Sequence, residues 1–266
     1  MRCVLFSIAV FLCATPSALA ACTGVYLQDT APRYVQNQAP QQAMELCYAA
    51  FAVEHSGVTR TPLWSAEHLT AANVESARTL PRHDDFHAES ELPRYQRAEL
   101  TDYVRSGYDR GHMAPSGDMP TREAQEQSFS LANIAPQAAA LNRGAWEEVE
   151  SATRDLGLRN GEVYVVTGPV FARGAPALIH NRVRVPDQVF KAVYDPQSGL
   201  AVAYIAANAS GARIRVISIA ALQRLIGADV FPALPARVKA QVSDLLGLTR
   251  DRYASAAGLA NRALQR

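Results

Sequence analysis

Apolar and polar residues follow strand-like patterns in several short stretches of the chain and a helical pattern in one longer stretch. We expect strands over residues 61–69, 128–134, 162–166, 189–194, 201–206 and 214–217. Over residues 141–158, apolar residues recur every three or four positions, which predicts a helix that Gly157 and Gly161 end. Further helices are expected up to Leu225 and over residues 236–246. Because strands and helices do not alternate regularly, the pattern predicts an α+β fold.

Two segments lack a regular pattern. Residues 21–60 predict a loop-like N-terminal arm, in which residues 42–53 are apolar enough to pack. Residues 75–100 are dense in charge and proline and predict a long exposed loop, a kind of segment that often carries function. We therefore expect one domain over residues 61–266, preceded by the arm. With 48% hydrophobic and 19% charged residues, the composition excludes a disordered or fibrous chain.

The first 20 residues have the pattern of a secretory signal. Arg2 is their only charge, residues 4–12 form a short apolar stretch, and Ala18 and Ala20 provide the small residues that signal peptidase recognises. The apolar run is too short and too interrupted for a membrane-spanning helix of ~20 residues. We expect residues 1–20 to be removed and the mature chain to be exported, periplasmic or secreted, without a membrane span.

Removal of the signal would leave two of the four cysteines, Cys22 and Cys47. Two cysteines in an exported chain most often pair, and a bridge over about 25 residues would stabilise the fold by ~3 kcal/mol. Residues 19–22 (LAAC) also resemble a lipobox, in which Cys22 would carry a lipid anchor. We favour the disulfide, because lipidation would leave Cys47 unpaired.

The charge pattern does not decide the class of partner. The formal net charge is +1, or zero without Arg2, which argues mildly against a large electrostatic surface for nucleic acid. The chain has 24 arginines and only two lysines, Lys191 and Lys239. Arginine suits phosphate recognition, but a GC-rich genome would produce the same bias.

Three neighbouring segments carry the candidate chemistry: residues 108–115 (YDRGHMAP), 132–137 (ANIAPQ) and 141–147 (LNRGAWE). A lone histidine is more often structural than catalytic. Here, however, an arginine lies two residues before His112 and an asparagine opens a helix about 30 residues later. Phosphodiester hydrolysis needs a base near neutral pH, a cationic group for the phosphate and a hard cation on the leaving oxygen.

Other catalytic patterns are incomplete. His83 and His87 stand four apart with two acids between them, but no further ligands complete a zinc site, so we interpret them as part of a surface loop. Ser116 lacks the elbow motif of a serine hydrolase. Phosphate-loop and dinucleotide-binding motifs do not occur in the sequence, so a nucleotide cofactor is not indicated.

In combination, the DRGH-x-A-P, N-x-x-P-Q and L-N-x-x-x-W elements resemble the DNA/RNA non-specific endonucleases, the family that includes endonuclease G. The resemblance covers residues 61–171 and extends more loosely to the C-terminus. It implies a ββα-metal (His-Me finger) core, at about residues 100–158, on a mixed, largely antiparallel sheet with flanking helices. It also implies that His112 is the general base, that Asn142 is the direct ligand of Mg²⁺, that Arg110 contacts phosphate and that Asn133 orders the site.

The resemblance extends to the helix after Asn142 and to the charged loop. It implies that Glu150 holds a metal-bound water and that Arg154 supports the site, although an ordinary i, i+4 pair between the two is the alternative. We interpret Glu147 and Glu148 as solvated charges on another face of this helix. Asp109 is expected to orient the first motif through hydrogen bonds.

An upstream arginine is expected to stabilise the transition state. Arg82 fits the family's spacing to an aromatic residue and an acid, Phe86 and Glu89, whereas Arg78 is the less suited alternative. For either arginine, the alternative is an ordinary salt bridge within the loop.

The sequence therefore predicts an exported endonuclease, dependent on Mg²⁺ or Mn²⁺, that cuts DNA and RNA with little sequence preference and leaves 5′-phosphates. Two alternatives remain: a catalytically silent module that binds nucleic acid or a partner, and a phosphodiesterase for small diesters. A homodimer and a cognate inhibitor protein are both compatible with the sequence.

Overall fold

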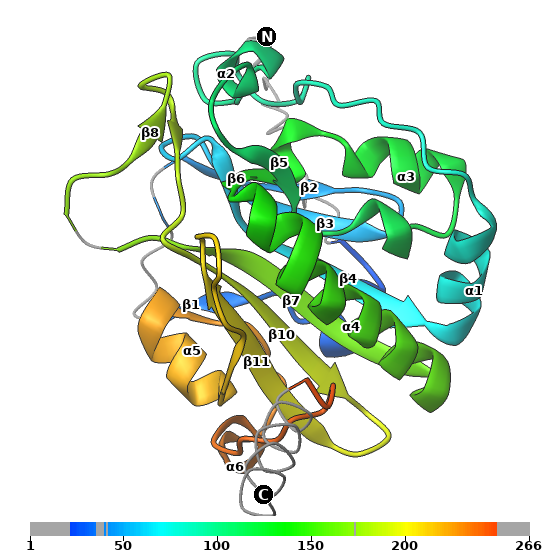
Figure 1. Ribbon diagram of the computed structural model, residues 1–266. Coiled ribbons are helices and arrows are strands. Elements are labelled where there is room, and N and C mark those ends of the chain that lie inside the picture. The colour runs from blue at the N-terminus through cyan, green and yellow to red at the C-terminus, as the bar shows by residue number, and fades with distance from the viewer. Residues whose placement is uncertain (1–21, 36–39, 41, 173, 249–266) are drawn as a thin grey trace, which may run out of the picture.

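The computed structural model describes residues 22–35, 40, 42–172 and 174–248 (Figure 1). Its centre is a seven-stranded sheet in the order β12-β11-β10-β7-β4-β3-β2, in which every neighbouring pair is antiparallel. These strands are β2 (Ala43–Cys47), β3 (Phe51–Ser56), β4 (Thr61–Thr70), β7 (Glu162–Val170), β10 (Gln188–Asp195), β11 (Leu200–Ala207) and β12 (Arg215–Ile217). The predicted α+β class and the largely antiparallel sheet are confirmed.

One face of this sheet carries helix α4 (Trp146–Asn160), which crosses the central strands (Figure 1). Strand residues two apart point to the same face. Val163 and Val165 of β7 therefore lie together with Val193 of β10, and all three pack against Trp146 and other apolar residues of α4. This packing explains why the helical pattern of residues 141–158 is amphipathic. The predicted helix is confirmed from Trp146 to Asn160, but Gly157 lies inside it and only Gly161 ends it.

The opposite face is covered by helix α5 (Ile219–Ile226) and by the described N-terminal residues. Ile219 and Leu222 of α5 pack with Tyr26 and with alternate residues of β4 and β10, such as Trp64 and Phe190. The smaller elements on this side are η1 (Leu27–Asp29), β1 (Arg33–Tyr34), β13 (Ala228–Asp229) and α6 (Ala236–Lys239). The sheet is therefore buried on both faces, which agrees with the nearly continuous apolar character of its inner strands.

A short antiparallel hairpin lies above the N-terminal end of α4 and forms a second, two-stranded sheet (Figure 1). Its strands are β5 (Asp109–His112) and β6 (Ile134–Gln137), and together with α4 they make a β-β-α unit. The segments around it contain α1 (Ala71–Thr79), α2 (Leu100–Tyr103), η3 (Ser116–Asp118), α3 (Arg122–Ser128), η4 (Leu131–Asn133), the π turn η5 (Leu141–Ala145), β8 (Leu178–Ile179) and β9 (Val183–Arg184).

Two predictions on the N-terminal side of the core are wrong. Strands β2 and β3 belong to the main sheet, so this part of residues 21–60 is not a loop-like arm outside the domain. Helix α1 occupies the start of the predicted loop at residues 75–100. The remainder of that loop is anchored: Ser130 Oγ donates a hydrogen bond of 2.7 Å to the buried carboxylate of Glu89, and Tyr48 also donates to it.

Residues 128–134 do not form a strand. They comprise the end of α3 and the turn η4, because serine and asparagine side chains there bond to nearby main-chain groups and compete with strand pairing. Ser128 Oγ donates to Gln125 O at 2.7 Å, and Asn133 Nδ2 donates to Ser128 O at 2.9 Å.

The helix expected over residues 236–246 is also wrong, because it ends at Lys239. The chain beyond it is held by Tyr204, whose hydroxyl accepts a hydrogen bond of 2.8 Å from the main-chain N–H of Leu246.

The predicted disulfide is present: Cys22 and Cys47 are bonded, so the N-terminal segment is tied to the end of β2. This bond occupies the Cys22 thiol that the lipobox alternative would use. The predicted signal, residues 1–20, lies outside the described residues. Among the helices that the structure describes, each is too short or too polar to cross a bilayer.

Candidate active site

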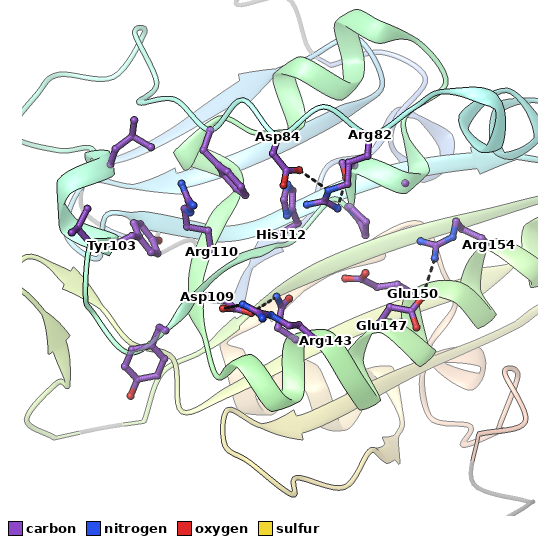
Figure 2. A pocket seen from close by; sticks show the side chains of 18 residues that line it. Arg82, Asp84, Tyr103, Asp109, Arg110, His112, Arg143, Glu147, Glu150 and Arg154 are labelled. Atoms are coloured by element: carbon purple, nitrogen blue, oxygen red, sulfur yellow. Dashed lines mark hydrogen bonds and ion pairs between the residues drawn. The ribbon is translucent and has the colours of Figure 1, made fainter.

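A pocket of about 750 Å³ opens between the hairpin, the N-terminal half of α4 and the segment that follows α1 (Figure 2). It contains every predicted site residue except Asn133. The lining consists of Arg82, Asp84, Phe86, Leu100, Tyr103, Val104, Tyr108, Asp109, Arg110, His112, Pro115, Ser116, Gly117, Asn142, Arg143, Glu147, Glu150 and Arg154. The residues of the first and third sequence motifs therefore meet at one place, although about 30 positions separate them.

Strand β5 directs Arg110 and His112 into the pocket. They are two residues apart on one strand, so both side chains point to the same side of the hairpin. Gly111 between them faces Gln137 of β6, and a Cβ at Gly111 would lie only 2.6 Å from Gln137 Cβ, an atom that cannot move away without its main chain. The glycine of the motif is therefore required by the close approach of the glutamine in the neighbouring strand.

His112 is nearly buried in an aromatic environment, with 9% of its surface exposed. Its ring centroid lies 5.3 Å from that of Phe86 and 5.0 Å from that of Phe129. Burial, together with the positive charges of Arg82 and Arg110, lowers the pKa of His112 to about 3. The imidazole is consequently neutral at pH 7 and has a lone pair available to accept a proton.

Arg82 reaches the pocket, whereas Arg78 does not line it in the described part of the chain. Arg82 Nε lies 2.6 Å from Asp84 Oδ1, and its Nη1 donates to Ser116 Oγ at 3.0 Å. The alternative, Arg78, pairs with Asp155 on α4 at 2.8 Å. Of the two candidates, the geometry favours Arg82.

Asn142 is oriented by Asp109, the residue at the start of the DRGH motif. Asn142 Nδ2 donates to Asp109 Oδ2 at 3.0 Å, and Arg143 forms two hydrogen bonds of 2.7 Å with the same carboxylate. Burial alone would raise the pKa of Asp109, but these hydrogen bonds outweigh it and the pKa is lowered. Because an ionised carboxylate only accepts hydrogen bonds, the amide nitrogen must face Asp109, and this leaves Asn142 Oδ1 as the donor atom for a cation.

Helix α4 presents Glu147, Glu150 and Arg154 on the face that borders the pocket (Figure 2). Arg154 Nη1 lies 2.9 Å from Asp118 Oδ1, and its Nη2 lies 3.7 Å from Glu147 Oε1. The alternative pairing with Glu150 is thus replaced by pairs with Asp118 and Glu147. The interpretation of Glu147 as a charge on another face is wrong, because residues seven apart fall on the same side of an α-helix.

Asn133 lies beneath the pocket and is fully buried. Its Nδ2 donates to Ala114 O at 2.8 Å, and its Oδ1 accepts from Ala114 N at 2.9 Å and from Ser65 Oγ at 2.8 Å. These bonds fasten the chain just after His112 to strand β4. Asn133 is therefore placed where it can order the site without contacting a substrate.

The structure adds two buried ionisable residues that the sequence patterns did not identify. Glu67 of β4 and Lys191 of β10 are fully buried on the sheet face that carries α4. Lys191 Nζ donates to Thr167 Oγ1 at 2.9 Å, whereas neither carboxylate oxygen of Glu67 has a hydrogen-bond partner within the described part of the chain. Lys191 could have been recognised from the sequence, because a lysine inside the apolar run of residues 189–194 indicates a buried charge.

The pocket combines oxygen donors with cationic groups, and this donor set fits a hard divalent cation such as Mg²⁺. Asn142 Oδ1 and the carboxylate of Glu150 are the candidate oxygens. Burial raises the pKa of Glu150 to about 7. The negative charge of Asp118 adds to this effect, whereas the positive charge of Lys191 opposes it. A cation beside Glu150 would stabilise its ionised form and remove part of this cost.

A β-hairpin followed by a helix, with a histidine, two arginines and an asparagine around one pocket, defines a ββα core. The sequence model of the DNA/RNA non-specific endonuclease family matches residues 29–237. The chain therefore belongs to this family, and the family predicted from the motifs is confirmed.

Individual relatives agree with this assignment. The chain is 34% identical to nuclease C1 of Cunninghamella echinulata var. echinulata over 167 residues, which are 58% of this chain and 66% of that protein. It is 33% identical to the mitochondrial nuclease EXOG of Danio rerio over 221 residues, which are 74% of this chain and 63% of that protein. This chain thus spans less than two thirds of the length of these relatives.

The fold also matches solved structures. In the crystal structure of the EndoG/EndoGI complex, which addresses the mechanism of EndoG inhibition, one chain is similar to this one with a TM-score of 0.67 and 27% identity. The match covers 74% of this chain and 88% of the other.

Proposed function

We propose that this protein is a metal-dependent endonuclease that hydrolyses phosphodiester bonds in DNA and RNA with little sequence specificity. The observation that supports the proposal most directly is the convergence of His112, Arg110, Asn142 and Glu150 on one pocket. Contacts to phosphate carry no sequence information, so a site built on arginines and a cation agrees with low specificity.

In the proposed mechanism, neutral His112 accepts a proton from the attacking water. Arg110 and Arg82 bind the phosphate oxygens and stabilise the negative charge that develops on them. Asn142 would be the direct ligand of Mg²⁺ or Mn²⁺ and Glu150 would hold the ion through a water, and such a cation would supply charge stabilisation at the leaving 3′ oxygen. This polarity of cleavage would leave 5′-phosphates.

The remaining residues of the site position these groups. Asp109 directs the amide of Asn142, Asn133 holds the main chain beside His112, and Arg154 fixes the face of α4 that carries Glu150. We include export of the chain, to the periplasm or the medium, in the proposal on the pattern of residues 1–20 and the disulfide. Since the related structure holds EndoG together with EndoGI, a cognate protein inhibitor is also part of the proposal.

The test is digestion of supercoiled plasmid, single-stranded DNA and RNA by the wild-type protein and two alanine variants, with Mg²⁺ or with EDTA. We expect His112→Ala to lose activity on all three substrates, with its circular dichroism spectrum unchanged. His68→Ala is the matched control, because His68 stacks on Tyr164 away from the pocket. Full cleavage by His112→Ala, or by wild type in EDTA, would contradict the proposal.

Two further measurements separate the alternatives. End-group analysis should find 5′-phosphates on the products. A small chromogenic diester should be a poor substrate compared with long DNA, whereas the opposite order would favour a phosphodiesterase for small diesters.

A further inference from the structure

A single aromatic side chain, Phe86, contacts two of the groups that the proposed mechanism uses. The guanidinium of Arg110 lies over the Phe86 ring at 4.1 Å from its centroid. The imidazole of His112 meets the same ring at 5.3 Å and an interplanar angle of 49°. Phe86 also lines the pocket, so it lies within the site and not merely beneath it.

The main chain around Phe86 is fixed by the rest of the fold. His87 forms a parallel bridge with Ser130, in which His87 N donates to Phe129 O at 3.2 Å and Leu131 N donates to His87 O at 2.8 Å. The ring of Phe129 supports that of Phe86 from the side, at 4.9 Å and 86°. The position of the Phe86 ring is therefore determined by neighbours that belong to the hairpin side of the site.

Polar interactions do little to restrain the two groups that Phe86 contacts. The Arg110 side chain is exposed, and no ion pair restrains it among the residues that the structure describes. The Nε2 atom of His112 is buried, and within the same residues it lacks a hydrogen-bond partner that would fix the ring. Within the described residues, contacts with aromatic rings are thus the main restraints on both side chains.

We propose that Phe86 is a positioning residue that holds the phosphate-binding arginine, Arg110, and the general base, His112, in a fixed mutual arrangement. This inference rests on the proposed function and extends it, because it assigns a role in catalysis to a side chain without any reactive group. The ring acts through Arg110 and His112 and transfers no proton itself.

The ring also shields His112 from water. The charged groups that act on His112 are Arg82 and Asp84, in the segment after α1, and Arg110 on β5. Loss of the ring would admit water to the imidazole and allow its pKa to rise towards the ordinary value of 6.5. Protonated His112 cannot accept a proton, so the acid limb of the rate profile should move to higher pH.

The experiment compares Phe86→Leu, Phe86→Tyr and a control, Phe171→Leu, by steady-state kinetics on one DNA substrate between pH 4 and 9. The control removes a similar stack, because Arg184 lies 4.7 Å from the Phe171 ring centroid and both residues lie outside the pocket. Thermal unfolding of each variant establishes a temperature at which all of them are folded.

For Phe86→Leu we expect kcat/KM to fall by about 2- to 30-fold, the range that one cation–π contact represents. We also expect the acid limb of kcat to shift upward. Phe86→Tyr, which keeps the ring, should restore most of the rate and the wild-type profile, and Phe171→Leu should leave both unchanged.

Equal kinetics in Phe86→Leu and Phe171→Leu would overturn the inference, as would failure of Phe86→Tyr to restore the rate. A loss of rate without any shift of the pH profile would also overturn it, since a merely structural defect lowers the amount of active protein at every pH. These results would not contradict the proposed function, because that proposal is tested separately by His112→Ala.

Discussion

The carboxylate of Asp118 lies 2.9 Å from the guanidinium of Arg154, and this ion pair connects η3 to helix α4. The Asp118 side chain is fully buried, whereas that of Arg154 is 17% exposed. A buried charge that loses its partner is strongly destabilising. The pair therefore couples stability to the placement of Glu150, which lies one helical turn before Arg154.

The first prediction is that Arg154→Met lowers the free energy of unfolding by about 3 kcal/mol, because Asp118 would remain buried without its main partner. Asp118→Asn in the same chain should recover about 1–2 kcal/mol of this loss, since the uncompensated charge is then removed. Urea unfolding of the two single variants and the double variant measures the coupling. Strictly additive losses would show that the two residues do not interact.

The second prediction concerns the link between cation binding and the proton on Glu150. The pKa of about 7 means that much of Glu150 is protonated at pH 6.5, and a bound divalent cation would favour the ionised form. We therefore expect Mg²⁺ to release protons on binding at pH 6.5. Calorimetric titrations in two buffers with different ionisation enthalpies would detect the release.

Glu150→Gln is the matched variant for this titration, because it keeps the size of the side chain and removes the ionisable group. Proton release should disappear in it, and chelation of the metal from wild type should reverse the release. An equal release from both proteins would assign the proton to another group.

The third prediction concerns Glu67, whose burial raises its pKa well above the usual value, with the nearby charge of Asp118 adding to this effect. The native state therefore keeps a proton on Glu67 that the unfolded chain loses above about pH 4.5. Because the native state binds more protons, this residue makes stability fall as the pH rises through and above that value. Glu67→Gln should thus raise the unfolding temperature more at pH 8 than at pH 5.

Exposed Glu123 on α3 provides the control for Glu67, since Glu123→Gln removes a carboxylate that is in contact with water. Its effect on the unfolding temperature should be small and similar at both pH values. If Glu67→Gln were destabilising at pH 8, the carboxylate would be ionised in the native protein and compensated by Lys191.

The fourth prediction is that replacing Cys22 and Cys47 together by serine lowers the free energy of unfolding by ~3 kcal/mol, the value for a bridge of this span. Nuclease activity per folded molecule should remain, because Cys22 belongs to the core on the sheet face opposite α4. Denaturant titrations with and without a reductant measure the effect. The double variant should be insensitive to the reductant, and an insensitive wild type would contradict the prediction.

Much of the fold could be predicted from the sequence because several elements carry their own pattern. The strands at residues 162–166, 189–194 and 201–206 are short apolar runs, and each lies within a strand of the main sheet. The helix after Asn142 shows its buried stripe in its spacing alone. Such elements can be predicted because the spacing of their apolar residues is visible within a short stretch of the sequence.

The failures arise where side chains decide the backbone conformation. The segment at residues 128–134 has an apolar alternation, but Asn133 and the serines use their side chains to bond the main chain. The role of Glu89 as an anchor depends on Ser130 and Tyr48, which are distant in sequence. Contacts between residues that are distant in the sequence cannot be predicted from the pattern of any short segment.

The site shows the same division. The resemblance of the motifs to the family pointed to Arg110, His112 and Asn142, whose residue types suit phosphodiester hydrolysis. Phe86 and Lys191 were not predicted to have special roles. An apolar ring in a loop and one lysine in a strand are both common in proteins without a function in a site. Glu147 could have been placed on the pocket side by helical arithmetic alone, since Arg154 is seven residues later.

The contact between Gly111 and Gln137 has a consequence for how such sequences can vary. The glycine belongs to the first motif and the glutamine to the second, and the space that one lacks is filled by the other. Because Gln137 Cβ itself would lie 2.6 Å from a Cβ at position 111, alanine there should become acceptable only when position 137 becomes glycine at the same time. In a library that randomises both positions, the residues found at positions 111 and 137 of folded variants should therefore depend on each other. The two motifs would then vary together because of this one steric contact.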